Sequence, residues 1–400
     1  MPFKIKGMEK LTMKLKFCAF LFVLCPAVFC GKIPAVEESA CFKKHVSPQT
    51  DVVSYILDVP GVAKNKQSIY FTHKSMTDDG RFLLFHGSDS NNFREKVLYV
   101  LDIKKEKVFK LTDTHMIPFL DVKTNQVYYI NRDGLYRHDL NISPGKPIKL
   151  ADFPADIKKL GKVRHICTHL TLTRDRKQVF LDMKINEYYI QGMLDIATGK
   201  FTIWGKTDFF INHGQIHPFR NDLALCAWEN LRGMKVNGKY PRLWLLEPGG
   251  KRKMIPPLAG YATHECWSED GKGFYYCSSG VYYHDLASGK QKKIVPMPAS
   301  HASMSGDNKY VTFDHIAGEQ WYRGCEWRIG FYNRETGKGL YFYPFLAAYN
   351  KANEKNDMHP DPHPQFVCNG KYIISTVNLG TGNMDLSITP VDQLIKITSH

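Results

Sequence analysis

The chain of 400 residues lacks a CxxC pair, a long basic block and, after its first thirty residues, any apolar run long enough to cross a bilayer. Without a CxxC pair, the seven cysteines after residue 30 are predicted to be small apolar residues within strands, and a disulfide is considered only for Cys41 with a distant partner. Without a basic block or a recognisable binding motif, nucleic acid is disfavoured as a partner. The third absence predicts no transmembrane segment.

The N-terminal segment is predicted to be a signal peptide over residues 1–30. Five lysines precede the apolar run 17–30, namely Lys4, Lys6, Lys10, Lys14 and Lys16. A basic stretch before a short apolar stretch is typical of secretory signals, so we expect a periplasmic or secreted protein. Lipid attachment at Cys30 and a buried N-terminal segment are the alternatives. Residues 31–50 are then expected to be a linker, and residues 51–397 a single catalytic domain.

The charge balance points to an anionic partner. The formal net charge is +15 and the isoelectric point is about 9.2. An exported basic protein suits an acidic oligosaccharide or polysaccharide, whereas a basic surface that only aids solubility is the alternative.

A histidine recurs at one position of an internal repeat. Each of five copies stands six residues before an Asp or Asn in a turn: His73, His169, His264, His301 and His363. His213 opens a sixth copy with a longer turn. A residue that recurs at the same position of a sequence repeat occupies the same place in each structural unit. If the units are arranged radially, the six imidazoles converge on one axis.

The repeat predicts an all-β fold, a seven-bladed β-propeller. Helical periodicity is weak, and strand-like runs separated by Gly, Asp and Asn turns dominate. Spacings of about 37 to 52 residues are typical of four-stranded blades. The units run over 65–113, 114–155, 160–207, 208–257, 260–297, 299–350 and 360–397. Unit two is the least clear, because Phe119 replaces its histidine and its turn is Lys123–Asn125, so six or eight blades are the alternatives. The segment 51–61 is expected to supply a strand that closes the ring.

The histidines are expected to lie at one mouth of the central channel, because the first strand of each blade lines it. Neutral imidazole is both a metal ligand and a base near pH 7. The segment HPDPHPQ (residues 359–365) adds a carboxylate and an amide, and mixed nitrogen and oxygen ligands suit Mn or Zn. Strand alternation predicts that Glu265 turns away from the channel, in a structural role. A proline-stiffened loop without metal and histidines that only join blades are the alternatives.

Several segments resemble oligogalacturonate lyases. These are HGQIHP (213–218), YPRLWLLEPGG (240–250), THECWSEDGKGFYY (263–276), HASMSGDN (301–308) and DPHPQF (361–366), together with IYFTHKSMTDDG (69–80). The resemblance extends from about residue 50 to residue 397. It implies a propeller that binds a divalent metal, Mn first and Zn or Ca as alternatives. The implied reaction is β-elimination at a 4-linked uronate, which yields a 4,5-unsaturated product.

The resemblance also implies roles for individual residues. His264 matches the catalytic base, and Arg242 matches the arginine that binds the substrate carboxylate. His301 and His363 match metal ligands, to which Asp361 and His359 are added as candidates. Met358 stands where the family has glutamine, and Asp361 where it has a histidine. His213 and Gln215 match a motif of the family and are expected to bind substrate. The repeat adds His73 and His169 as candidates for substrate binding, because they are expected at the same mouth of the channel.

Two other classes of function are considered. A non-catalytic propeller of the TolB type, which binds an acidic glycan or a protein, is equally compatible with the repeat alone. A hydrolase with paired carboxylates is disfavoured, because no pair of acids stands out at the expected mouth. The combination of Arg242, His264, His301 and His363 favours the lyase, since a binding scaffold does not require it.

Overall fold

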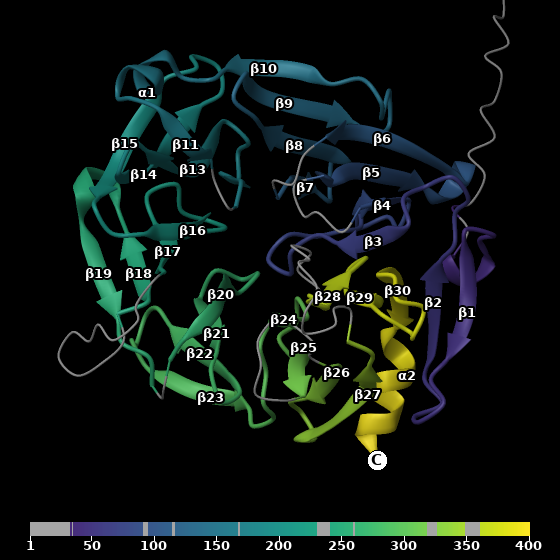
Figure 1. Ribbon diagram of the computed structural model, residues 1–400. Coiled ribbons are helices and arrows are strands. Elements are labelled where there is room, and N and C mark those ends of the chain that lie inside the picture. The colour runs from purple at the N-terminus through teal and green to yellow at the C-terminus, as the bar shows by residue number, and fades with distance from the viewer. Residues whose placement is uncertain are drawn as a thin grey trace, which may run out of the picture. The chain divides into compact units, whose positions relative to one another are not determined.

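Seven antiparallel sheets of four or five strands follow one another around a ring (Figure 1). The computed structural model describes residues 33, 35–90, 95–113, 117–166, 169–229, 241–258, 261–317, 326–348 and 361–400. The expected signal peptide, Met358 and His359 lie outside these residues. Residues 33–400 belong to one folded unit. No helix among the described residues is long and apolar enough to cross a membrane.

The first four blades each follow the chain outward from the centre of the ring. Blade one contains β3 (Asn65–Ser68), β4 (Phe82–Ser88), β5 (Val97–Asp102) and β6 (Lys107–Asp113). Blade two contains β7 (Phe119–Asp121), β8 (Gln126–Ile130), β9 (Gly134–Asp139) and β10 (Ile148–Asp152). Blade three contains β11 (Val163–Ile166), β12 (Thr171–Leu172), β13 (Gln178–Ile185), β14 (Tyr188–Asp195) and β15 (Phe201–Thr207). Blade four contains β16 (Ile211–Ile216), β17 (Ala224–Trp228), β18 (Leu243–Leu246) and β19 (Arg252–Ile255).

The last three blades complete the ring. Blade five contains β20 (Thr263–Trp267), β21 (Gly273–Cys277), β22 (Val281–Asp285) and β23 (Gln291–Val295). Blade six contains β24 (Ala302–Met304), β25 (Tyr310–Ala317), β26 (Glu326–Asn333) and β27 (Lys338–Leu346). Blade seven contains β28 (Gln365–Val367), β29 (Tyr372–Val377), β30 (Asp385–Pro390), β2 (Val53–Leu57) and β1 (Phe42–Val46). The helical elements are η1 (Val36–Glu38), η3 (Ile103–Lys105), η4 (Pro248–Gly250), α1 (Ala155–Lys159) and α2 (Val391–Ser399).

The prediction of a seven-bladed propeller is confirmed, including unit two. The turn at Lys123–Asn125 joins β7 to β8, and the Phe119 ring packs against the His73 ring at 6.3 Å between centroids. The closing strand is confirmed as well, because β2 pairs with β30 through Tyr55↔Ile388 and Ile56↔Ser387. An N-terminal strand therefore completes the C-terminal blade.

Residues 31–50 differ from the expected linker. They include η1 and strand β1, which pairs with β2 over its whole length. Phe42 and Val36 are buried against blade one, so this segment is part of the folded core. At the other end, α2 continues the fold beyond the last predicted strand and buries Val391 and Leu394 between blades six and seven.

The hydrophobic core is divided among the junctions between blades. Seven clusters of buried apolar residues occur in the described part of the chain, one at each junction of neighbouring blades. Trp267, for example, packs between blades four and five with Leu225 and Phe274. Because each blade buries both faces, residues of the middle strands are buried throughout, as in β4 and β21.

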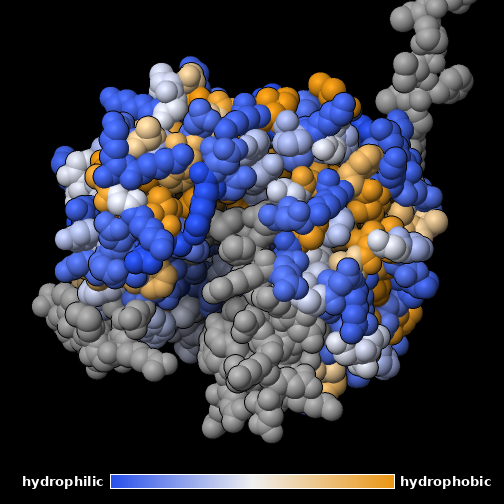
Figure 2. Space-filling view, turned by 45° about the horizontal axis from the view of Figure 1, so that its top comes forward, coloured by the Kyte–Doolittle hydropathy of each residue, from blue (hydrophilic) through white to orange (hydrophobic). Residues whose placement is uncertain are grey.

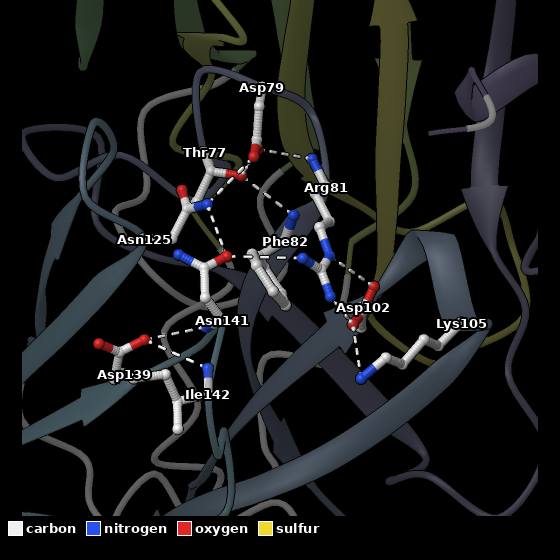
Figure 3. A network of polar contacts seen from close by, with 10 residues as sticks. All are labelled: Thr77, Asp79, Arg81, Phe82, Asp102, Lys105, Asn125, Asp139, Asn141 and Ile142. Atoms are coloured by element: carbon white, nitrogen blue, oxygen red, sulfur yellow. Dashed lines mark hydrogen bonds and ion pairs between the residues drawn. The ribbon is translucent and has the colours of Figure 1, made fainter. Parts of the chain in front are cut away.

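The repeated turn aspartates hold the turns and join neighbouring blades. In four units the hydroxyl two residues earlier donates to the aspartate at 2.6–2.7 Å, the donors being Thr77, Thr173, Ser268 and Ser305. Asn125 Nδ2 of blade two also donates to Asp79 Oδ2 of blade one at 3.0 Å (Figure 3). The same network continues through Asn141 to Arg81, which pairs with the buried Asp102 at 2.9 Å (Figure 3). These repeat residues therefore have a structural function.

The described face of the molecule is mostly polar (Figure 2), and the described cysteines form no disulfide. The face in Figure 2 is mostly hydrophilic where residues are described, and its apolar side chains show as separate patches. Cys41, Cys226, Cys266, Cys277 and Cys368 are free thiols, so Cys41 has no disulfide partner in the described part of the chain. Burial raises the pKa of the Cys41 thiol, which disfavours the thiolate form near neutral pH.

Candidate active site

The six repeat histidines converge, as the repeat predicts. They form two groups of three, with His73, His169 and His213 in one and His264, His301 and His363 in the other. Neighbouring ring centroids within the groups are 3.9–5.3 Å apart. The Tyr70 ring joins the groups, because its centroid lies 4.6–6.0 Å from those of four histidines: His169, His213, His301 and His363.

A location at the mouth of the channel requires exposure, which four of these histidines lack. His213 and His264 are partly exposed, whereas His73, His169, His301 and His363 are buried. The cluster therefore extends from a partly exposed layer into the interior of the ring. A buried imidazole is stable there only when neutral or matched by a carboxylate, so the two layers differ in electrostatics.

Three of the histidines have a left-handed backbone. The φ angles are +53° at His213, +53° at His264 and +46° at His363. Such angles are uncommon for residues other than glycine, and they accumulate at functional sites. The pairing register shifts at the first two, between Asn212 and Gln215 and between Thr263 and Cys266. Each bulge re-aims the side chains that follow it.

The prediction that Glu265 turns away from the channel is wrong for this reason. Glu265 is buried and faces two of the site residues, with Oε2 3.3 Å from Arg242 Nε and Oε1 3.5 Å from His213 Nδ1. The left-handed residue at His264 breaks the alternation on which the prediction relied. Burial alone would raise the pKa of Glu265, but Arg242 and His213 lower it to about 2.

Arg242 is held between two carboxylates. It lies just before β18, with Nη1 2.8 Å from Glu229 Oε1, in addition to its contact with Glu265. Burial would lower the pKa of Arg242, but Glu265 and Glu229 raise it, so the guanidinium is charged. His213 completes the group, with Nε2 3.8 Å from Glu229 Oε1. The two carboxylates therefore fix the orientation of the arginine.

His301, Asp361 and His363 form a possible metal site. One ligand atom of each lies within 4.8 Å of the others, and all three side chains are buried. His301 Nε2 is 3.8 Å and His363 Nε2 3.6 Å from Asp361 Oδ2. No hydrogen bond satisfies His301 Nε2 within the described residues. Two imidazoles and a carboxylate are ligands suited to a borderline divalent ion, so the site fits a metal.

Asp314, which belongs to no repeat position, orients this site. It is buried in β25, and His301 Nδ1 lies 3.0 Å from each of its two oxygens. Its oxygens also accept the backbone N–H of His301 at 2.8 Å and of His363 at 3.1 Å. A carboxylate on the far nitrogen of an imidazole fixes the tautomer of a metal ligand. The sequence feature that could have indicated a role for Asp314 is its position as an acid inside the apolar run YVTFDHIA.

His264 has a defined tautomer. Its Nδ1 lies 2.5 Å from the Ser300 carbonyl oxygen, which can only accept a hydrogen bond. Nδ1 is therefore the protonated nitrogen, and Nε2 carries the lone pair. Burial, and then the charges of His301 and Arg242, lower the pKa of His264 well below its usual value. The ring is neutral at pH 7, as a proton acceptor must be.

The other predicted substrate-binding residues lie deeper in the ring. His73 is bonded on both nitrogens, to Thr72 Oγ1 at 2.9 Å and to the Leu170 carbonyl at 2.8 Å. His169 stacks on His73, and burial lowers the pKa of His169 well below its usual value. Gln215 Nε2 donates to the Glu265 carbonyl at 2.9 Å and so links blades four and five.

Lys96 and Tyr70 also lie near the cluster, and the sequence did not predict either of them as a site residue. Lys96 is buried and hydrogen-bonded to Gln67 of β3. Burial lowers the pKa of Lys96 to about 7, although Asp361 acts in the opposite direction. Tyr70 is partly exposed, and burial raises its pKa well above the usual value. Neither residue belongs to the histidine repeat, so the pattern that revealed the other residues could not reveal these.

The fold and the histidine cluster together define a seven-bladed propeller with a candidate polar site at its centre. No protein-family model and no curated protein sequence matches the chain. Among solved structures, the oligogalacturonate lyase of Vibrio parahaemolyticus superposes with a TM-score of 0.69 at 18% identity, over 88% of this chain and 96% of that one. An oligogalacturonate lyase in complex with manganese gives 0.69 at 19% identity, over 87% and 96%. TolB from Acinetobacter baumannii gives 0.42 at 13% identity, over 77% and 80%. The resemblance to oligogalacturonate lyases is confirmed for the fold.

Proposed function

We propose that the protein is an exported polysaccharide lyase that cleaves 4-linked uronate glycans by β-elimination and releases 4,5-unsaturated products. One observation carries the proposal. The ring of His264, whose Nε2 carries the lone pair, lies 3.9 Å between centroids from His301 of the possible metal site. A proton acceptor and a charge-stabilising site are thus adjacent, as abstraction of a proton next to a carboxylate requires.

His301, Asp361 and His363 are the residues proposed to hold a divalent metal. Manganese is the first candidate, supported by the manganese complex of a lyase with a similar fold, and zinc and calcium are the alternatives. His359 is a further proposed ligand outside the described residues. A divalent ion held there would supply positive charge that neutralises a uronate carboxylate and favours loss of the C5 proton.

The chain's own residues supply the remaining functions. Arg242 keeps the N–H groups that Glu229 and Glu265 do not use available for the substrate carboxylate. His264 Nε2 takes the C5 proton, because the Ser300 carbonyl holds the proton on Nδ1. His213 is proposed to contact the sugar near the partly exposed layer. The net charge of +15 and the resemblance support an acidic oligosaccharide as substrate.

The test is the appearance of ultraviolet absorbance from the conjugated double bond of the product. The purified protein would be incubated with Mn²⁺ and with oligogalacturonides, pectin, ulvan and glucuronate-bearing glycans. A rise with one substrate would establish the lyase and identify its sugar. No rise across the panel, with metal bound and glycan binding retained, would favour a non-catalytic binding propeller.

The assignment of His264 has its own variant. His264→Ala should abolish product formation while the metal content stays unchanged, because the ring is the base and not a ligand. His45→Ala is the matched control, since His45 lies on the outermost strand β1. Retained turnover in His264→Ala would refute its role as base.

A further inference from the structure

We propose that Tyr70 is a catalytic residue whose hydroxyl protonates the departing O4 of the sugar. This inference rests on the proposed function, because only an elimination with a sugar leaving group needs such a proton. A lyase of this kind requires two proton transfers, one from C5 and one to O4. The histidine repeat supplies the first but no obvious donor for the second.

The chain places Tyr70 in the site by interrupting the inner strand of blade one. β3 ends at Ser68, and pairing with β4 resumes only at the Met76–Leu83 bridge. The intervening segment is held firmly: Gln365 of blade seven donates to the Ile69 carbonyl at 2.8 Å and accepts from Ser75 N at 2.8 Å. The hydroxyl of Ser75 also accepts from Ile69 N at 3.0 Å. A residue on a segment fixed at both ends is suited to a positioned catalytic group.

The contacts of Tyr70 come from several blades. Its ring meets those of His169 and His213 on one side of the cluster, and those of His301 and His363 on the other. Phe71, the next residue, packs against His264, His301 and His363. Tyr70 therefore lies between the Arg242 group and the possible metal site, where the uronate carboxylate and the bond to be broken are expected.

The hydroxyl of Tyr70 is also available to a ligand. Tyr70 as a whole residue is partly exposed, and no hydrogen bond joins its hydroxyl to another residue in the described part of the chain. The competing donors are engaged: Lys96 donates to Gln67, and His213 lies between Glu229 and Glu265. Among the described residues of the cluster, Tyr70 therefore offers a hydroxyl proton that is not committed to a neighbouring residue.

The proposed step balances in protons and electrons. The C5 proton passes to His264 Nε2, and the electron pair of the C5–H bond forms the C4=C5 double bond. The C4–O4 bond breaks, and O4 takes the proton of the Tyr70 hydroxyl. The phenolate regains a proton from water and His264 loses one to water, so no other reactant is needed.

The test combines Tyr70→Phe with two substrates of the same uronate. One carries the natural sugar at O4, and the other carries a nitrophenyl group, whose anion departs without protonation. With the natural substrate, turnover should fall about 10²- to 10⁴-fold, the usual contribution of a general acid. With the nitrophenyl substrate, turnover should stay within about tenfold of the wild type, since protonation matters little for a weakly basic leaving group.

A second readout separates the acid from the base. Exchange of the C5 proton with deuterium from D₂O should persist in Tyr70→Phe and disappear in His264→Ala. Tyr99→Phe in β5 of the same blade is the control for loss of a phenol hydroxyl, because Tyr99 stacks on Phe85 outside the cluster. Metal content and thermal unfolding of Tyr70→Phe should match the wild type.

The outcomes distinguish the two proposals. If the wild type yields no unsaturated product, the proposed function fails and Tyr70 loses its role with it. If the wild type is active and Tyr70→Phe is equally active on the natural substrate, the inference about Tyr70 alone is overturned. An equal loss with both leaving groups would also overturn it, because the hydroxyl would then not act on O4.

Discussion

At the scale of the residue, equivalent positions in the repeat have acquired different environments. Burial lowers the pKa of His301, but the charge and hydrogen bond of the adjacent Asp314 carboxylate together have the larger opposite effect. The pKa of His301 is therefore raised. His264 faces a carbonyl instead, and its pKa is lowered. Histidines at the same repeat position are therefore suited to different roles, proton acceptance or metal binding, depending on the group that contacts Nδ1.

The stability of the protein should fall in mild acid because of His73. Burial lowers the pKa of His73 to about 4 in the folded protein, against an ordinary value of 6.5. Between these values the unfolded chain binds a proton that the folded protein does not. The stabilisation is complete above pH 6.5 and is lost as the pH falls towards 4, by at most about 1.4 kcal/mol per pH unit.

His73→Gln tests this dependence. Urea unfolding at pH 7 and pH 5 should show a drop in the free energy of unfolding that is about 2 kcal/mol smaller in the variant than in the wild type. The same drop in both proteins would mean that other groups account for the acid sensitivity.

At the scale of the element, the ring depends on strands from the two ends of the chain. β2 lies beside β30, and β1 covers β2, so blade seven has five strands. Gln393 of α2 strengthens the closure by accepting from Val53 N at 2.9 Å and donating to the Val53 carbonyl at 2.7 Å. Ring closure pairs an edge that would otherwise be exposed.

Leu57→Ala should destabilise the whole ring. Leu57 ends β2, is 1% exposed and packs at the junction of blades seven and one. Loss of a buried leucine side chain typically costs about 2–5 kcal/mol, measured as a shift in the urea unfolding midpoint. Val46→Ala on β1 is the control, because Val46 is 46% exposed and should change stability by less than about 0.5 kcal/mol. A small effect of Leu57→Ala would show that this junction is dispensable.

At the scale of the whole molecule, the site draws its parts from blades that the chain visits far apart. Arg242 and His213 come from blade four, His264 and Glu265 from blade five, His301 and Asp314 from blade six, and Asp361 and His363 from blade seven. A metal bound to His301 and His363 would therefore link the inner strands of blades six and seven. Binding to the folded state alone stabilises it by mass action.

Manganese should accordingly raise the melting temperature of protein first stripped with a chelator. The stabilisation is about 2.7 kcal/mol when the free ion is 100 times its dissociation constant. Magnesium should have a smaller effect, because it prefers oxygen ligands. His301→Ala should abolish the manganese effect, and a wild type indifferent to manganese would contradict the proposed site.

The part of the site that follows a periodic rule could be predicted from sequence, and the rest could not. The histidines recur at one phase, so their convergence followed once a radial fold was inferred. Glu265 was misplaced because a left-handed residue at His264 breaks the strand alternation. Asp314 and Glu229 belong to no repeat, and their partners lie on other strands or other blades.

The sequence by itself determined the propeller class, the closing strand and the identity of the repeated histidines, and it favoured seven blades over six or eight, because strand and turn preferences act over a few residues and recur along the chain. The tertiary structure alone decided which histidine faces a carboxylate and which a carbonyl, and it alone brought Tyr70 between the two histidine groups. Those relations depend on contacts between blades, such as Gln365 with Ile69 across 296 positions of sequence. Contacts of that range leave no local pattern, and they set the chemistry of each side chain.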